Sequence, residues 1–298
     1  MKRLISANTS EILAMSAAEL KQSIRASEGR VVVSENVATR ESYIGDITNA
    51  EIARAFGADL ILLNCVDVLE PHIFGLKHDK DNFVKELHRL VGRPIGVNLE
   101  PIDFTAELLE DRQEIPKGRQ LNEATAERLG ALGFDFVCLT GNPGTGVTNE
   151  QIKQAIRLTK KHFSGLVIAG KMHAAGSDEP VAELAVAKSF VEAGADVILV
   201  PAVGTVPGFD ADELRAVVKE VHRLGGLVMS AIGTSQESAD EATIRELAIA
   251  NKICGVDMQH IGDAGYGGVA PVENIYAMSK ALRGIRHTVS MIARSINR

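Results

Sequence analysis

The chain has 298 residues, of which 45% are hydrophobic and 24% are charged, and it carries a formal net charge of −7. That length is ample for a sizeable core, and the acidic balance excludes the basic surface expected of a nucleic-acid-binding protein. Tryptophan is absent and aromatic residues make up only 4%, so stacking platforms for single-stranded nucleic acid are not expected either.

The N-terminal segment, residues 1–20, has no apolar stretch of the signal-peptide type. No apolar run along the chain reaches the roughly 20 residues needed to span a bilayer. The three cysteines, Cys65, Cys138 and Cys254, lie far apart, which favours buried thiols in a reducing compartment over disulfides or a zinc site. We therefore expect a cytoplasmic protein that has no membrane or nucleic-acid partner.

Residues 10–28 predict a helix, and after it eight apolar runs alternate with amphipathic segments such as 148–163 and 209–224. The runs are typical of strands buried on both faces. They cover residues 30–36, 59–67, 94–100, 134–142, 165–171, 196–203, 226–233 and 256–263. Strand then helix, eight times, at spacings of roughly 30 residues, predicts a (β/α)8 TIM barrel. We predict one domain, residues 1–298, with the barrel proper at about 30–285 and an extra helix at each end.

A short motif directly precedes every second predicted strand. Gly, one residue and then Asp precede the second, fourth, sixth and eighth strands, in FGAD, LGFD, AGAD and CGVD. The glycine is expected to end a helix in a left-handed turn. Two and four residues after each Asp stand mostly branched aliphatics, which should face the helices. The intervening positions should therefore face the barrel axis, and they include Asn64, Thr140, His260 and Gly262, although Gln259 breaks the pattern in the last strand.

Polar residues gather at the predicted strand ends, which form the active site in a TIM barrel. Lys171 and His173 follow the fifth strand, and Glu100 ends the third. Lys171 is predicted to bind an anion or to act as a base or Schiff-base amine, with His173 or Glu100 as its acid/base partner. A salt bridge at the rim is the structural alternative for Lys171. The residues predicted to bind substrate are Asn36, Asn64, Asn98, Thr140, Asn142, Ser230 and His260.

Two glycine-rich loops predict a phosphate site. Backbone amides that glycines leave accessible near helix starts bind anions, and the loops after strands seven and eight commonly hold a phosphate in TIM barrels. The alternative is that these glycines only form turns. The loop at 140–147 lacks the Lys-Ser/Thr ending of a P-loop, so nucleoside triphosphates are not expected. The predicted phosphate-binding residues are Gly233, Thr234, Gly262, Gly265, Gly267 and Gly268.

No cofactor is required by these patterns, and Mg²⁺ is left open. Its oxygen ligands would be Asp67 and Glu100, with Glu35 and Asp263 as further acidic candidates.

The segments DFVCLTGNPGTGVTNEQIKQAIR and LVIAGKM resemble the region between the fourth and fifth strands of BtpA-like barrels. The whole chain resembles an uncharacterised bacterial family of phosphate-binding TIM barrels, labelled phosphotransferase-system-associated or haloacid dehalogenase-like. A dehalogenase fold needs an Asp-x-Asp strand end near the N-terminus, whereas NCVDVLEP offers only Asp67. Phosphoenolpyruvate-mutase-like barrels are another similar group, but their clustered metal-binding acids are not evident.

These features favour an enzyme that acts on a small phosphorylated sugar or sugar acid, as an aldolase, another lyase or an epimerase, through an enediolate or enamine. A Mg²⁺-dependent lyase, mutase or phosphohydrolase and a non-catalytic metabolite-sensing barrel are the alternatives. The C-terminal helix carries an apolar stripe of Val289, Ile292, Ala293 and Ile296, which predicts a homo-oligomer.

Overall fold

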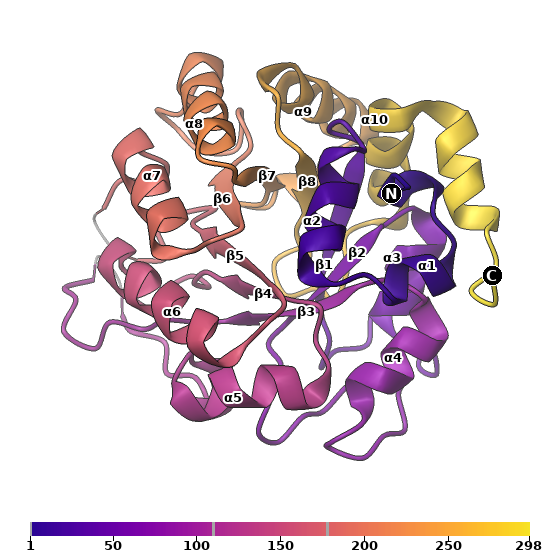
Figure 1. Ribbon diagram of the computed structural model, residues 1–298, viewed down its shortest axis with the longest axis horizontal. Helices are drawn as coiled ribbons and strands as arrows, with labels where there is room; N and C mark the ends of the chain where they lie inside the picture. Colours follow the sequence, from indigo (N-terminus) through magenta and orange to yellow (C-terminus); the bar gives the residue numbers. More distant parts are fainter. Residues whose placement is uncertain (1, 109–110, 177–178) are drawn as a thin grey trace.

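The computed structural model describes residues 2–108, 111–176 and 179–298. Eight parallel strands pair in chain order and close into a barrel, which confirms the predicted (β/α)8 fold (Figure 1). Each strand lies within one of the eight predicted apolar runs or extends it by one residue. The strands are β1 (Val31–Val37), β2 (Leu60–Asn64), β3 (Ile95–Leu99), β4 (Phe136–Leu139), β5 (Leu166–Gly170), β6 (Val197–Pro201), β7 (Leu227–Ile232) and β8 (Met258–Ile261).

Helices surround the barrel and also extend the chain at both ends. The predicted N-terminal helix is in fact two, because Ser16 and Glu19 form a capping box that starts a new helix. At the other end, Gly284 has non-helical backbone angles and divides the last helix, so the predicted terminal helix begins at Ile285. The helices are α1 (Thr9–Leu13), α2 (Ala17–Arg25), α3 (Asn49–Phe56), α4 (Phe83–Val91), α5 (Glu123–Leu132), α6 (Asn149–His162), α7 (Leu184–Ala193), α8 (Ala211–Arg223), α9 (Glu241–Cys254) and α10 (Val272–Ala293), with short 3₁₀ turns η1 (Leu4–Ser6), η2 (Lys117–Arg119) and η3 (Gln236–Ser238).

The strand faces follow the alternation predicted for the even strands. Ile61, Val137 and Ile198 belong to the hydrophobic layer between strands and helices. Leu62, Cys138, Leu199 and Met258 belong instead to a second cluster inside the barrel. Gln259 fits the same alternation, because it faces outward and its Nε2 donates to the carbonyl of Ala248 in α9.

The N-terminal segment closes one end of the barrel. Leu4, Ile12, Leu20 and Ile24 are buried and pack into the interior cluster together with residues that start the strands. In Figure 1, α2 lies across the barrel next to β1. Since this end is filled with apolar side chains, open space for a ligand is left to the C-terminal ends of the strands.

The Asp of each Gly-x-Asp motif joins two strands. Its carboxylate accepts a hydrogen bond from a backbone N–H in the preceding odd strand, at 2.7–3.0 Å, and also contacts a basic side chain. The four sets are Asp59 with Val32 N and Arg283, Asp135 with Ile95 N and His88, Asp196 with Val167 N and Lys160, and Asp257 with Val228 N and His222. The motif is therefore a structural clamp at the closed end of the barrel, repeated four times.

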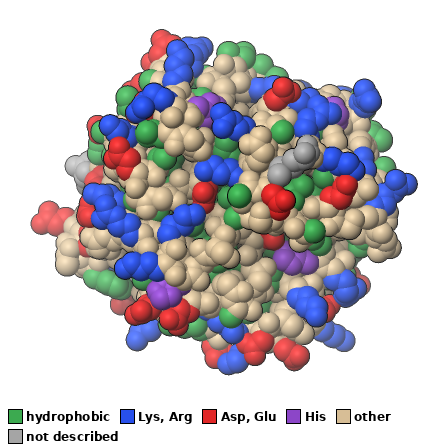
Figure 2. Space-filling view, in the orientation of Figure 1, with side chains coloured by type: hydrophobic (Ala, Val, Ile, Leu, Met, Phe, Trp, Pro, Cys, Tyr) green, Lys and Arg blue, Asp and Glu red, His purple; other side chains and the backbone are tan. Residues whose placement is uncertain are grey.

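Acidic and basic side chains are interspersed over the face of the molecule shown in Figure 2, with no large area of a single charge. Within the described ranges, no helix combines the length and the apolar character needed to cross a membrane.

Candidate active site

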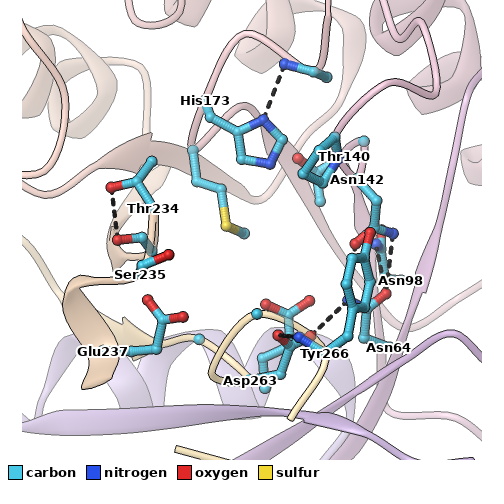
Figure 3. Close-up of a pocket in the computed structure, with 18 of the residues that line it drawn as sticks. Asn64, Asn98, Thr140, Asn142, His173, Thr234, Ser235, Glu237, Asp263 and Tyr266 are labelled. Atoms are coloured by element: carbon cyan, nitrogen blue, oxygen red, sulfur yellow. Dashed lines mark hydrogen bonds between the residues drawn. The ribbon is translucent and has the colours of Figure 1, made fainter. Parts of the chain in front are cut away.

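The C-terminal ends of the strands surround a cavity of about 570 Å³. Its walls come from the ends of β1–β4 and from the loops that follow β4, β5, β7 and β8 (Figure 3). Three carboxyl groups line it, and among the described residues no lysine or arginine does. The polar lining residues are Glu35, Asn64, Asn98, Thr140, Asn142, His173, Thr234, Ser235, Glu237, Asp263 and Tyr266.

Three buried oxygen atoms of this lining have no hydrogen-bond partner within the described part of the chain. They are Asn98 Oδ1, Thr140 Oγ1 and Glu237 Oε2, on residues that are 3%, 1% and 3% exposed. A buried polar atom without a partner costs about 1–3 kcal/mol, so such atoms are rare in native proteins. Their convergence on one cavity is the pattern expected of a binding site for a polar ligand.

Three amide side chains form a hydrogen-bonded group on one wall. Asn64 Nδ2 donates to Asn142 Oδ1 at 2.9 Å, and Asn142 Nδ2 donates back to Asn64 Oδ1 at 3.1 Å. Asn98 Nδ2 donates to Asn64 Oδ1 at 3.3 Å, and Asn64 Nδ2 also donates to Asp263 Oδ2 at 2.9 Å. The structure thus brings together three of the four asparagines that the sequence predicted, and it adds Asp263 to them.

Glu100 supports this wall from behind and does not line the cavity. Its Oε2 accepts the backbone N–H of Asn142 at 2.8 Å, and its Oε1 accepts Asn142 Nδ2 at 2.8 Å and Arg119 Nη2 at 2.9 Å. Both carboxylate oxygens are therefore engaged by the protein. The arrangement suits a residue that orients Asn142 and not the predicted acid or base.

Lys171 also lies outside the cavity lining. It has the same parity along the chain as Val167 and Ala169, which face the helices. Its Nζ donates to Glu179 Oε2 at 2.9 Å, and the same oxygen accepts the backbone N–H of Asn149 at the start of α6. Burial lowers the pKa of Lys171, and the hydrogen bond to Glu179 opposes that shift. The geometry matches the salt-bridge alternative, in which Lys171 braces the loop after β5.

His173 does line the cavity, and its protonation state is set by its surroundings. Its Nδ1 accepts the backbone N–H of Ala175 at 2.9 Å, while the other ring nitrogen faces the cavity (Figure 3). Burial, reinforced by the nearby charge of Lys171, lowers the pKa of His173 to about 4. The imidazole is therefore neutral at physiological pH, with its proton on Nε2, where it can donate to a ligand.

Glu35, at the end of β1, is a candidate acid that the sequence suggested only as a metal ligand. Its Oε2 lies 3.1 Å from Nε2 of His260, which is fully buried beside it and does not line the cavity. Burial raises the pKa of the Glu35 carboxyl; the imidazole of His260 opposes this, and the carboxyls of Asp263 and Glu237 add to it. Glu35 consequently keeps a proton to higher pH than an ordinary glutamate.

The glycine-rich loops contribute to the cavity only in part. Of the predicted phosphate-binding residues, Gly233, Thr234, Gly262 and Gly265 line it, and Gly267 and Gly268 do not. The same loops bring in Glu237, which the sequence did not single out. Burial raises the pKa of Glu237 and the carboxyl of Asp263 adds to the shift, whereas backbone N–H groups, including that of Gly265, oppose it. A carboxyl of the chain itself thus faces the turn where a phosphate was expected.

The remaining predicted residues are not brought to the cavity. Asn36 and Ser230 share the parity of outward-facing neighbours, and Asn36 Nδ2 donates to Ser34 Oγ and to the carbonyl of Glu35. Asp67 accepts the backbone N–H groups of the two loop residues Leu69 and Glu70. Asn36 and Asp67 thus serve local structure, whereas the buried Oγ of Ser230 has no hydrogen-bond partner among the described residues.

No predicted Mg²⁺ ligand belongs to a preformed metal cluster in the described ranges. The one group of acidic and histidine side chains spaced closely enough to share an ion there is Glu123, Glu127 and His162, on the helices α5 and α6. Its two glutamates are exposed on the outside of the barrel. The candidates Asp67, Glu100, Glu35 and Asp263 are not part of it.

Comparison with known proteins identifies a family but no activity. Residues 5–298 match the family described as Domain of unknown function (DUF7916). No curated protein matches the chain. The BtpA-like, phosphotransferase-associated and dehalogenase-like resemblances therefore stay predictions.

Solved structures share the fold at low sequence identity. An archaeal fructose 1,6-bisphosphate aldolase is 15% identical with a TM-score of 0.56, and the match covers 93% of this chain and 99% of that one. A protein from Burkholderia cenocepacia J2315 with a provisional lyase/mutase assignment is 17% identical with a TM-score of 0.51, covering 86% of this chain and 83% of that one. At these identities the likeness shows the barrel fold alone.

Proposed function

Because the chain belongs to the DUF7916 family of domains of unknown function, we propose its activity from the cavity itself: a lyase-type enzyme that transfers protons next to the carbonyl group of a small hydroxylated substrate. The observation that carries this proposal is a pair of groups on one cavity whose pKa values are shifted in opposite directions. Burial keeps His173 neutral, and burial also raises the pKa of Glu35. Such pairs are typical of acid–base sites.

His173 is assigned the role of electrophile. Its Nε2–H would donate to the substrate carbonyl oxygen, whose negative charge grows as an enediolate forms. Glu35 would exchange the proton at the neighbouring carbon, with the imidazole of His260 at 3.1 Å to orient it. The amide group of Asn64, Asn98 and Asn142 would bind substrate hydroxyls.

A phosphate on the substrate fits the exposed rim of the cavity better than its buried end. Glu35, Glu237 and Asp263 are 4%, 3% and 8% exposed and would repel a phosphate placed beside them. Thr234 and Ser235 also line the cavity but are exposed to solvent. We therefore propose that a sugar or sugar acid binds with its carbonyl inside and its phosphate at Thr234 and Ser235. The two similar structures are described as an aldolase and a lyase/mutase, which agrees with this class of chemistry.

Hydrogen exchange tests this function whatever product the reaction yields. The protein would be incubated in D₂O with a panel of sugar phosphates and sugar acids, and proton NMR would follow deuterium entry beside the carbonyl and any carbon–carbon cleavage. We expect exchange with at least one compound. His173→Ala should slow it by about 10²–10³-fold, the usual effect of losing one donor to a developing oxyanion. The matched control is His72→Gln, because His72 is exposed and outside the cavity.

The two alternatives give different results in the same assay. A metabolite-sensing barrel would be stabilised by a member of the panel but would catalyse no exchange or cleavage. A Mg²⁺-dependent enzyme would lose its activity after treatment with EDTA and regain it with added Mg²⁺.

A further inference from the structure

The buried end of the cavity is an acceptor-rich, acidic environment. Its acidic groups are the carboxyls of Glu35, Glu237 and Asp263, and no lysine or arginine of the described chain lines it. The lining atoms that lack partners there are all oxygens, on Asn98, Thr140 and Glu237. Such a lining is complementary to a ligand that is rich in hydrogen-bond donors and positively charged.

Glu237 and Asp263 form the strongest part of this environment. Both carboxyl groups are directed into the cavity (Figure 3), and each is less than 10% exposed. Asp263 is held in place, because its Oδ2 accepts Asn64 Nδ2 at 2.9 Å and its Oδ1 accepts the backbone N–H of Tyr266 at 3.0 Å. Glu237 Oε2 has no partner among the described residues. Two buried carboxyls that face one space repel each other unless a proton or a cation lies between them.

The types of group that line the cavity favour an ammonium group over a bare metal ion. Ligand oxygens on one Mg²⁺ lie about 2.1 Å from the ion and so no more than about 4.2 Å from one another. Within the described chain, the cavity carboxylates do not form a group of three with all ligand atoms within 4.8 Å. An ammonium group carries its own three N–H donors, each of which takes one acceptor at about 2.7–2.9 Å, so two carboxylates and a neighbouring amide or hydroxyl oxygen are enough to bind it. The ring of Tyr266 lines the same cavity, and aromatic faces attract ammonium groups.

We propose that the substrate carries a protonated amine, which Glu237 and Asp263 bind at the buried end of the cavity. The inference rests on the proposed function and narrows its substrate class to amine-bearing hydroxylated carbonyl compounds, such as amino sugars. Glu35 is left to exchange the proton, and the exposed rim is left for a phosphate.

Paired probes that differ only by an amine test this inference on the unaltered protein. Isothermal titration calorimetry at neutral pH would compare D-glucosamine with D-glucose and ethanolamine with ethylene glycol. We expect the amine of each pair to bind about tenfold or more tightly. Glu237→Gln keeps the shape of the side chain and should remove that preference, since truncating or neutralising one partner of a buried charge pair usually costs 2 kcal/mol or more, roughly thirtyfold in affinity. Glu123→Gln is the control, because Glu123 is exposed on α5.

Each other outcome overturns the proposal. Equal affinity for the two members of both pairs, including no binding of either at high millimolar concentration, would rule out an amine site. MgCl₂ alone binding in a Glu237-dependent manner would make the cavity a metal site, and inorganic phosphate binding in that manner would make it an anion site. Asp263→Asn provides a second variant if Glu237→Gln does not fold.

The failure of this inference is distinguishable from failure of the proposed function. Deuterium exchange on neutral sugar phosphates without any amine preference would reject the amine site and leave the enzyme. Amine-selective binding without exchange or cleavage of any compound would retain the site and reject the enzyme.

Discussion

The burial of His173 makes the stability of the fold depend on pH. The N–H of Ala175 donates to its Nδ1, and burial lowers the pKa of His173 to about 4. In the unfolded chain a histidine titrates near about 6.5, so between these values the unfolded state binds a proton that the folded state does not. Stability should therefore fall as pH drops from about 6.5 toward 4, and it should be independent of this group above that window.

The measurement is urea denaturation at about pH 7.5 and about pH 5, with His173→Gln beside the unaltered protein. The unaltered protein should lose about 1–2 kcal/mol more on acidification than the variant. Glu35 and Glu237 act with the opposite sign, since their raised pKa values make the folded state bind more protons; they are present in both proteins, so they largely cancel. An identical loss in both proteins would show that His173 does not titrate in this way.

Lys171 illustrates how one contact decides between two chemical roles. Its Nζ is bonded to Glu179 and does not line the cavity. Lys171→Met should cost about 1–3 kcal/mol of stability, because the pair joins the loop after β5 to the start of α6. Borohydride treatment in the presence of carbonyl substrates should leave Lys171 unmodified by mass spectrometry. Lys188→Met, which removes an exposed helix pair with Glu192, should be nearly neutral. A reduced adduct on Lys171 would restore the Schiff-base hypothesis.

Among the elements, the four Asp clamps differ chiefly in how deeply they are buried. Asp59 and Arg283 have side chains that are 1% and 0% exposed, whereas the side chain of Asp135 is 22% exposed. Asp59→Ala leaves a buried guanidinium without its carboxylate and should cost about 3–5 kcal/mol. Asp135→Ala should cost about 1–3 kcal/mol through the lost hydrogen bonds. Asp46→Ala is the control, because Asp46 lies at an exposed loop position, and it should cost no more than about 0.5 kcal/mol. Urea denaturation gives the three values. Equal losses for Asp59 and Asp135 would contradict the dependence on burial, and losses as small as that of Asp46 would contradict the clamp.

The same motif explains which site residues could be predicted. In the even strands it fixes the side-chain parity, so Asn64 and Thr140 were correctly directed into the barrel. The odd strands have no such marker, and there Asn36, Lys171 and Ser230 were expected at the mouth although their parity turns them outward. A polar residue at a strand end has two possible faces, and only a pattern that counts along the strand distinguishes them.

The positions of loop residues could not be predicted by counting along a strand. Glu237 reaches the cavity through a loop in which Thr234 and Ser235 both adopt positive φ angles, 54° and 73°. No period in the sequence signals that path, since non-glycine residues adopt this conformation only where the surrounding structure requires it. The alternation of strands and helices, by contrast, is periodic over the whole chain, which is why the barrel itself was predictable.

On the scale of the whole molecule, the two ends of the chain cover different parts of the barrel. The N-terminal helices fill the closed end of the barrel. The segment after Gly284 covers part of the outside: Thr288 and Met291 are buried, and the side chain of Ile296 lies close to Gly92 at the end of α4. The predicted apolar stripe is thus partly used within the chain.

Val289 of that stripe, together with Ile285 one turn before it, makes the predicted homo-oligomer testable. Ile285 and Val289 are spaced one helical turn apart, on the same side of the helix, and are 52% and 50% exposed. Two such β-branched side chains gain by burial against a second copy, at about 25 cal/mol per Å² of apolar surface removed from water. We expect light scattering to show an oligomer for the unaltered protein and a monomer for the double variant Ile285→Glu with Val289→Glu. The variant should stay folded, with an unchanged far-ultraviolet circular dichroism spectrum, because neither side chain is buried within a single chain. Phe104→Glu, a change at a 71% exposed loop residue, should leave the oligomer intact. A monomeric mass for the unaltered protein would contradict the prediction and leave both side chains exposed to solvent.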